Sequence, residues 1–302
     1  MTGVVNVYKE PGWTSSDAVN KLKGVLRERR VGHAGTLDPG AEGVLPVCVG
    51  NATRLFDYLT TRKKVYLATI RFGKTTDTQD ADGTVLEEKP VTFSQNAFLG
   101  ALERFTGTIL QTPPMYSALH VNGKRLYELA RRGVAAEIPA RTVTVERLEA
   151  VTPLSDNACV LRVTCSKGTY IRTLCHDIGQ ALGCGAYMEH LLREEAGGLR
   201  AENALRISEI EERIQKGDAS FLIPTDQAVA FLPRVDLSSD AAKRLANGNP
   251  VPLRAARVPR DGTVRLYCGG EFYGIGEKQE DVYAIKCMLR EDHEHDSGTG
   301  HF

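Results

Sequence analysis

The chain has 302 residues, of which 42% are hydrophobic and 25% are charged, and its formal net charge is zero. This composition is that of an ordinary globular protein, and the length allows one large domain and a small one. There is no run of about 18 apolar residues and no basic start followed by a long apolar stretch. We therefore expect a cytoplasmic protein with neither a membrane span nor a signal peptide.

Local patterns predict several elements in the first two thirds of the chain. Thr14 and the serines after it can cap a helix whose apolar residues recur at helical spacing, and a turn-rich stretch follows over residues 32–43. Ser94 can cap a second helix, and Gly183 can end a third. In chain order, the later elements are expected as a strand over 64–73, a loop over 77–83, a helix over 97–105, strands over 141–151 and 159–165, and a helix over 169–182.

The pattern changes near residue 230. A short helix is expected at 238–248, and strands are expected on either side of a Gly269-Gly270 turn. The end of the chain therefore predicts a small, mostly β unit. The polar tail, residues 291–302, is expected to be disordered.

Cysteine spacing says little about chemistry. The seven cysteines are scattered and form no Cys-x-x-Cys pair, so we expect buried free thiols and no metal site. Residues 77–83 (DTQDADG) resemble a calcium loop only faintly, because the acids and the glycine have the wrong spacing.

The residues taken alone leave several roles open. Asp38 lies between Leu37 and Pro39 in a glycine-rich loop, which is usually only a turn. Tyr66 alone suits a core tyrosine, and Arg172 alone suits a helix surface. The basic side chains near residue 130 suit either a solvated helix face or phosphate contacts; they are Lys124, Arg125, Arg131 and Arg132.

Several long segments, in order, resemble the TruB family of tRNA pseudouridine synthases. The strongest is GHAGTLDPGAEGVLPVCVGNATR (32–54), which resembles the family's catalytic motif. Ala34 stands where a threonine is common, and this changes nothing catalytic. The others are NVYKEPGWTSSDAV (6–19), with Lys9 and Pro11, KVYLATIRFGKTTDTQDADG (64–83), QTPPMYSALHVNGKRLYELARRG (111–133) and SKGTYIRTLCHDIGQALGCGAYMEHLLRE (166–194).

The resemblance implies a role for each matching residue. Asp38 matches the catalytic aspartate, Arg172 matches the arginine paired with it, and Tyr66 matches the tyrosine that stacks on the target base. Tyr170 and Leu191 match substrate contacts, and His33 matches a histidine that inserts where the flipped nucleotide was. The basic residues near 130 then belong to a segment that grips RNA.

The resemblance also implies the fold and the reaction. We expect a mixed α/β (α+β) pseudouridine synthase-like catalytic domain over 1–229 with a central, largely antiparallel sheet. The RNA-gripping insertion would occupy about 111–140, and a PUA-like RNA-binding domain would occupy 230–290. The expected reaction is isomerisation of a flipped-out uridine at position 55 in the T loop of tRNA, without a cofactor, by a monomer with no obligatory protein partner.

Three other readings remain at this stage. A guide-RNA-dependent, dyskerin-type relative shares the aspartate motif but lacks the inserted segment. An RNA-binding or tRNA-folding module would make isomerisation secondary. A glycoside hydrolase would need a second positioned carboxylate, and none is evident beside Asp38. The chemistry is also open, since one carboxylate can attack C1′, attack C6 or start an elimination from C2′.

Overall fold

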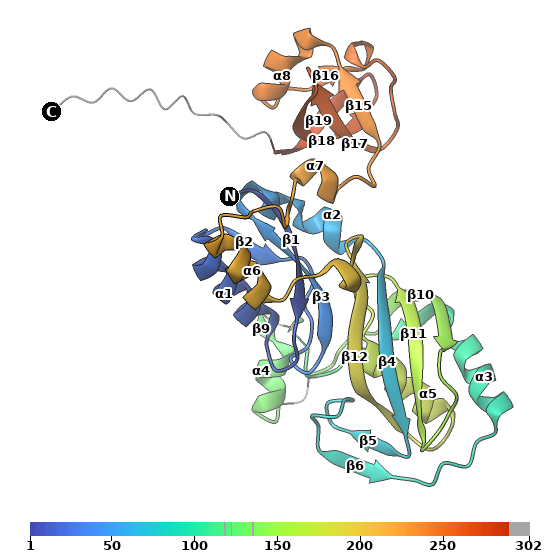
Figure 1. Cartoon of the computed structure of the whole chain (residues 1–302). Helices are drawn as coiled ribbons and strands as arrows, with labels where there is room; N and C mark the ends of the chain where they lie inside the picture. The colour runs from blue at the N-terminus through green and yellow to red at the C-terminus, as the bar shows by residue number, and fades with distance from the viewer. Residues whose placement is uncertain (118, 122, 135, 290–302) are drawn as a thin grey trace.

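The computed structural model describes residues 1–289, apart from residues 118, 122 and 135 (Figure 1). Ten strands in the described residues form one large sheet. Its main path is, in spatial order, β14 (Leu222–Ile223), β1 (Gly3–Lys9), β3 (Glu42–Val49), β12 (Ala186–Ala196), β4 (Lys64–Phe72), β11 (Ala158–Cys165), β10 (Arg141–Ala150) and β7 (Gly107–Gln111). Two further strands, β2 (Val31–His33) and β13 (Leu199–Arg200), pair with β3 and β12.

The sheet is largely antiparallel, as the sequence predicted. The single parallel pairing in the described sheet joins β12 to β3. The stretch 32–43, which was expected to be turn-rich, is part of β2 at its start and part of β3 at its end. Both ends of the stretch form strands because their backbone groups pair with the sheet and extend its ladder of hydrogen bonds.

Helices pack against two apolar clusters of this sheet. The helical segments before residue 230 are α1 (Ser15–Leu26), η1 (Gly50–Leu55), α2 (Phe56–Thr60), α3 (Gln95–Arg104), α4 (Leu126–Arg131), α5 (Ile171–Ala181), η2 (Ala201–Asn203), α6 (Ile207–Gln215) and α7 (Thr225–Ala228). α1 packs on β1 and β3, whereas α3 and α5 pack on the half containing β4 and β11. Thr14 caps α1 and Ser94 caps α3, which confirms both predicted helix starts.

One face of the sheet carries both helical clusters. Lys9, Gly43, Arg193 and Tyr66 are cross-strand partners along β1, β3, β12 and β4, so the side chains of Lys9, Arg193 and Tyr66 share a face. Val5 and Val7 lie on this face under α1. The residues at every second position of β4 from Tyr66 onwards lie on the same face under α5. The loop over 34–41 crosses the same face between the two halves.

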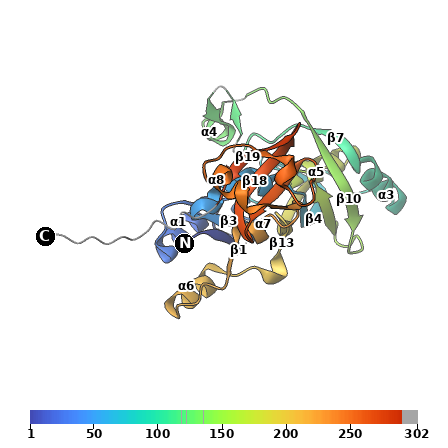
Figure 2. The same ribbon diagram turned by 90° about the horizontal axis from the view of Figure 1, so that it is seen from above.

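Two small hairpins lie outside the main sheet. β5 (Lys74–Thr76) and β6 (Val85–Glu88) extend beyond the end of β4, and their connection contains Asp80 (Figure 1). β8 (His120–Val121) and β9 (Lys124–Arg125) precede α4. In the view from above, α4 and α6 lie on opposite sides of the molecule (Figure 2).

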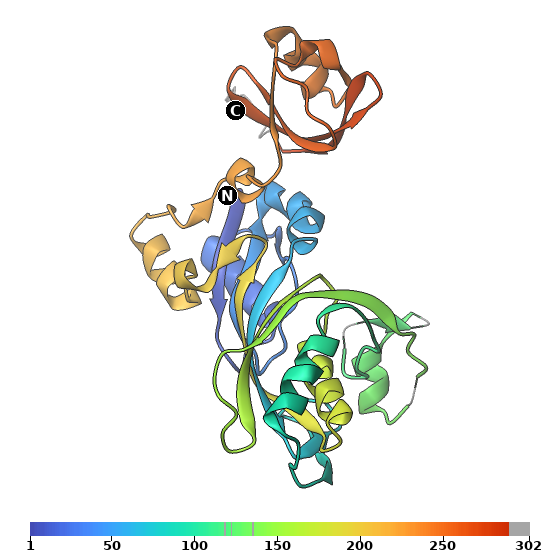
Figure 3. The ribbon, with the colours of Figure 1, turned by 90° about the vertical axis from the view of Figure 1, so that its right-hand side faces the viewer.

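The last fifth of the chain forms the small β unit that the sequence predicted. Its sheet has the order β15 (Arg234–Leu237), β17 (Thr263–Cys268), β18 (Glu271–Gln279), β19 (Val282–Met288) and β16 (Val251–Pro252), with η3 (Ser239–Ala241), α8 (Ala242–Ala246) and η4 (Leu253–Ala255) between strands. This unit stands beyond the end of the large sheet (Figures 1 and 3). Ile275 and Cys287 join Leu55 and Leu59 in one apolar cluster, which attaches the unit to η1 and α2.

Two further expectations concern the whole chain. All seven cysteines are free and buried, as predicted. Within the described residues, no helix is both long enough and apolar enough to cross a membrane. The tail over 291–302 lies outside the described residues.

The pairing of β3 with β12 depends most directly on glycine at Gly43. Its φ is +103°, and a Cβ there would lie 2.4 Å from the carbonyl oxygen of Arg193. We predict that Gly43→Ala lowers the free energy of unfolding by about 2 kcal/mol or more, from backbone strain and the clash. Urea denaturation monitored by circular dichroism measures this.

Gly100 provides the matched control. It lies inside α3, and nothing lies within 4 Å of the Cβ that alanine would add. Gly100→Ala should therefore stabilise the protein by roughly 0.5–1 kcal/mol. Equal stabilities of the two variants would contradict the close approach described at Gly43.

Candidate active site

The loop that carries Asp38 is fixed from beneath by two buried polar side chains. Ser15 Oγ accepts a hydrogen bond from the Leu37 amide at 2.9 Å and donates one to the Leu37 carbonyl at 3.1 Å. Lys9 is 1% exposed, and its ammonium donates to the carbonyls of Glu10, Trp13 and Pro39 at 3.1, 2.8 and 3.1 Å. The residues on both sides of Asp38 are therefore tied to the start of the chain.

A second buried cation supports the beginning of the same loop. Arg193 is 1% exposed, and its guanidinium donates to the carbonyls of Val44, Thr36 and Gly35 at 2.7, 3.1 and 3.1 Å. Three neutral acceptors satisfy a charge that would otherwise be very unfavourable in the interior. The loop thus approaches the sheet closely and presents Asp38 away from it.

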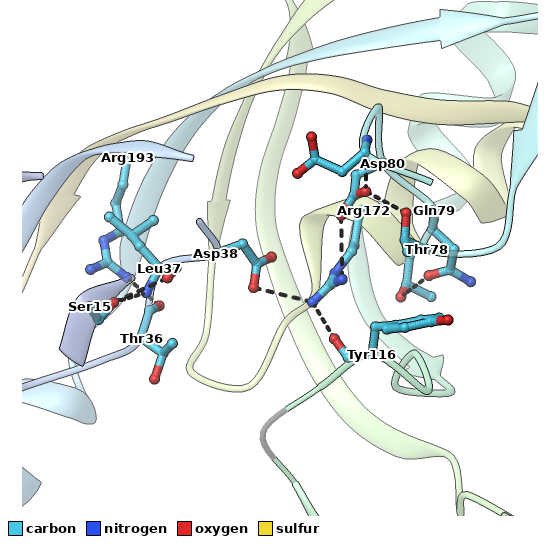
Figure 4. Close-up of polar contacts among 12 residues, drawn as sticks. Ser15, Thr36, Leu37, Asp38, Thr78, Gln79, Asp80, Tyr116, Arg172 and Arg193 are labelled. Atoms are coloured by element: carbon cyan, nitrogen blue, oxygen red, sulfur yellow. Dashed lines mark hydrogen bonds and ion pairs between the residues drawn. The ribbon is translucent and has the colours of Figure 1, made fainter. Parts of the chain in front are cut away.

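Arg172 joins Asp38 to two other segments of the chain (Figure 4). Its Nη2 lies 3.2 Å from Asp38 Oδ1 and 2.8 Å from the Tyr116 carbonyl, and its Nη1 lies 3.4 Å from Asp80 Oδ2. The Arg172 side chain is 6% exposed, whereas that of Asp38 is 36% exposed. The arginine is therefore a buried support, and the carboxylate that it holds remains accessible to a substrate.

Asp80 is itself held by its own turn. Thr78 Oγ1 donates to Asp80 Oδ1, and the Asp82 amide donates to the same oxygen at 3.2 Å. Thr173, the residue after Arg172, donates to the Gln79 side chain at 2.7 Å. Burial raises the pKa of Asp80, while Thr78 and Arg172 act in the opposite direction.

The two tyrosines expected at the site lie near Asp38. Burial raises the pKa of Tyr66 to about 12, and the charge of Arg193 opposes this increase. Burial also raises the pKa of Tyr170, which directly precedes α5. The negative charge of Asp38 contributes to both increases, since all three side chains lie in one region.

The other expected contact residues lie at varied depths. Leu191 is 6% exposed and belongs to the same apolar cluster as Leu37 and Tyr66. His33 ends β2 and is partly buried, and burial lowers its pKa. Its Nδ1 has no hydrogen-bond partner among the described residues. Pro11 lies exposed in the connection between β1 and α1.

The basic residues of the expected RNA-gripping segment lie on β9 and α4. Lys124 and Arg125 form β9, and Arg131 ends α4, but their side chains lie outside the described part of the structure. Arg132 follows α4 and is exposed.

Sequence reasoning missed two contributors to the site. Asp80 lies in the stretch that was set aside as a failed calcium loop, and Tyr116 contributes only its backbone carbonyl. A carboxylate in a turn is visible in the sequence, but its approach to Arg172 depends on contacts between distant strands. Chemically, the arrangement offers an oriented carboxylate, a buried counter-charge and aromatic side chains that can face a planar base.

Solved structures share this fold. One from a Cbf5-Nop10-Gar1 complex is 25% identical, with a TM-score of 0.73 over 96% of this chain and 84% of that chain. Another, from an H/ACA ribonucleoprotein bound to a substrate RNA containing 2′-deoxyuridine, is 23% identical, with a TM-score of 0.73 over 96% of this chain and 85% of that one. The fold is that of a pseudouridine synthase.

Sequence comparison gives the family. The pattern of the TruB family pseudouridylate synthase N-terminal domain matches residues 23–171, and that of the tRNA pseudouridylate synthase B C-terminal domain matches 172–230. A third pattern, pseudouridine synthase II TruB, C-terminal, matches 233–283. The chain belongs to the TruB family.

Curated relatives agree over nearly the whole length. The tRNA pseudouridine synthase B of Streptococcus mutans is 45% identical over 95% of this chain and 98% of its own length. That of Streptococcus thermophilus is 40% identical over 96% and 99%. That of Lachnoclostridium phytofermentans is 49% identical over 82% and 84%.

The contact between Arg172 and Asp80 predicts a kinetic effect. Asp80→Asn removes one of two carboxylates that flank the guanidinium, so Arg172 should hold Asp38 less firmly. We predict a roughly 10- to 100-fold slower single-turnover isomerisation of tRNA, with the dissociation constant for tRNA changed by less than about threefold.

Glu87→Gln on β6 is the control, because it removes the same charge from an exposed residue of the same hairpin. Its rate should match the wild type. An Asp80→Asn enzyme that reacts within about threefold of the wild-type rate would show that Arg172 does not need this carboxylate.

Proposed function

We propose that this protein isomerises uridine to pseudouridine at position 55 in the T loop of tRNA, with Asp38 as the catalytic carboxylate. The observation that carries the proposal is the accessible Asp38 carboxylate held by buried Arg172, in a member of the TruB family. The curated relatives named tRNA pseudouridine synthase B support tRNA as the substrate.

The reaction balances without a cofactor. The N1–C1′ bond of the nucleotide breaks, the uracil turns, and a C5–C1′ bond forms. The proton on C5 is lost, and N1 gains a proton, so there is no net redox change. The carboxylate of Asp38 serves attack at C1′, attack at C6 or an elimination that begins at C2′. Arg172 keeps the carboxylate aimed in each route.

The aromatic and apolar residues near Asp38 receive the extruded base. Extruding a stacked uridine costs a few kcal/mol, and stacking on an aromatic ring returns roughly 1–3 kcal/mol. Tyr66 provides that ring, with Tyr170 and Leu191 as further contacts. His33 occupies the space that the flipped nucleotide leaves in the RNA. The raised pKa of Tyr66, about 12, keeps its phenol protonated at neutral pH, so the hydroxyl acts as a donor or orders a water.

The rest of the chain binds RNA outside the reaction centre. The insertion over about 111–140 contacts phosphates through Lys124, Arg125, Arg131 and Arg132. Residues 1–229 form the catalytic domain and 230–290 a PUA-like RNA-binding domain. The protein acts as a monomer in the cytoplasm, without an obligatory protein partner.

Replacing Asp38 tests the function directly. Asp38→Asn should abolish isomerisation yet leave tRNA binding within about tenfold, roughly 1.4 kcal/mol, because phosphate contacts dominate the affinity. The measurement is mapping of pseudouridine in a tRNA transcript, together with filter binding. Asp57→Asn, at an exposed position of α2, is the charge-matched control and should react like the wild type.

The outcomes separate the competing readings. Appreciable turnover by Asp38→Asn, after checking for deamidation back to aspartate, would reject Asp38 as the catalytic group. Tight tRNA binding by a wild-type protein that forms no pseudouridine would favour the tRNA-folding module instead.

Tyr66 should matter for chemistry more than for docking. Tyr66→Phe keeps the stacking face and removes the hydroxyl, and Tyr66→Leu removes the ring. If the hydroxyl takes part in removing the C5 proton, Tyr66→Phe should slow single-turnover isomerisation about 10²- to 10⁴-fold. Tyr66→Leu should in addition lose the stacking contribution of roughly 1–3 kcal/mol.

Tyr187→Phe on β12 is the control, because it removes a hydroxyl from a partly buried tyrosine elsewhere. A Tyr66→Phe rate within about threefold of the wild type would leave Tyr66 as a stacking surface only. A wild-type rate for Tyr66→Leu as well would remove it from the site.

A further inference from the structure

Gln111 is a buried polar residue at the edge of the active site, and both polar atoms of its side chain form hydrogen bonds. It is the last residue of β7 and is 2% exposed. Its Nε2 donates to the Tyr170 carbonyl at 3.0 Å, and its Oε1 accepts from the Tyr170 amide at 2.7 Å. One carboxamide therefore binds both backbone groups of a single residue.

Those two bonds fix the start of α5. Tyr170 is the N-cap residue of this helix, and its side chain makes no capping hydrogen bond. Its carbonyl also accepts the first intrahelical bond, from Leu174 at 3.0 Å. Arg172 is the second residue of the helix, so the position of the Tyr170 backbone sets where the guanidinium begins.

Gln111 itself is held in place by the large sheet. The backbone of Gln111 pairs with Arg141 on β10, which in turn pairs with β11 inside the large sheet. The carboxamide therefore connects the helix that carries Arg172 to the same sheet that supports the Asp38 loop. A side chain with one hydrogen-bonding group could restrain only one of the two backbone groups of Tyr170.

The segment that follows Gln111 also reaches Arg172. Five residues later, the carbonyl of Tyr116 accepts the 2.8 Å hydrogen bond from Arg172 Nη2. The first residues of the insertion thus contact both Tyr170, at the start of the helix, and the Arg172 guanidinium.

We propose that Gln111 is a positioning residue that holds Arg172 against Asp38 by fixing the start of α5. This rests on the proposed function, since it assumes that Arg172 orients a catalytic Asp38. Gln111 itself does not touch the reacting atoms.

The test replaces the carboxamide by a side chain of similar length without hydrogen-bonding groups. Gln111→Met should slow single-turnover isomerisation at saturating enzyme about 10- to 100-fold, which is the effect of a small displacement of catalytic groups. The dissociation constant for tRNA should change by less than about threefold. Gln95→Met, at the exposed start of α3, is the matched control and should change neither quantity.

A second variant covers loss of folding. If Gln111→Met does not fold, as judged by circular dichroism, Gln111→Asn carries the test. It keeps the amide but is one methylene too short to reach both backbone groups, so the same rate loss is expected. A folded variant with a wild-type rate at saturating enzyme overturns the proposal, and so does a rate loss that is seen only below saturation, because that loss would lie in tRNA binding.

A double replacement separates positioning from general destabilisation. Gln111→Met and Asp80→Asn both loosen Arg172, so their combined rate loss should be clearly smaller than the product of the two single losses. A combined loss equal to that product would mean that Gln111 acts independently of Arg172. Inactivity of the wild-type protein would reject the proposed function, whereas an active wild type with an unaffected Gln111→Met would reject this inference alone.

Discussion

The buried charge of Arg172 is the constraint on which the rest of the site depends. A guanidinium that is 6% exposed needs acceptors, and it finds the carboxylates of Asp38 and Asp80 and the Tyr116 carbonyl. Removing one partner from a buried ion pair typically costs about 3–5 kcal/mol, because the remaining charge is left without compensation. Three segments that are far apart in the sequence must therefore meet at the start of α5, and that meeting forms the site.

The same logic explains why so many polar groups are buried near one loop. Lys9, Arg193 and Ser15 all satisfy backbone groups on either side of Asp38. Burial lowers the pKa of Lys9 to about 8, because its ammonium loses hydration there, and the charge of Asp38 opposes this decrease. An apolar interior would be easier to build there. The polar supports instead hold a short loop in one conformation and leave only its carboxylate accessible, which is what a preorganised site requires.

Local patterns in the sequence predicted the elements whose signals are local. The capped helices α1 and α3 and the alternating strand β4 were predicted because caps and a period of two act over a few residues. The central strand β12 was not predicted, because two register shifts and buried Arg193 obscure its alternation. From the residue types alone, Arg172 was expected on a helix surface, and only the resemblance placed it beside Asp38. Neither the residue types nor the resemblance identified Asp80, because its role arises from a contact with Arg172, 92 positions away in the sequence.

The central claim is that Arg172 works as a bridge among several acceptors and not merely as a positive charge. Arg172→Lys keeps the charge but replaces the planar fork by a single ammonium, which cannot span Asp38, Asp80 and Tyr116 in the same geometry. The most direct measurement is single-turnover isomerisation of tRNA by this variant, with tRNA affinity determined alongside. The account predicts a loss of at least about 100-fold in rate with affinity nearly unchanged. A rate within about threefold of the wild type would contradict it, because a charge near Asp38 would then be sufficient.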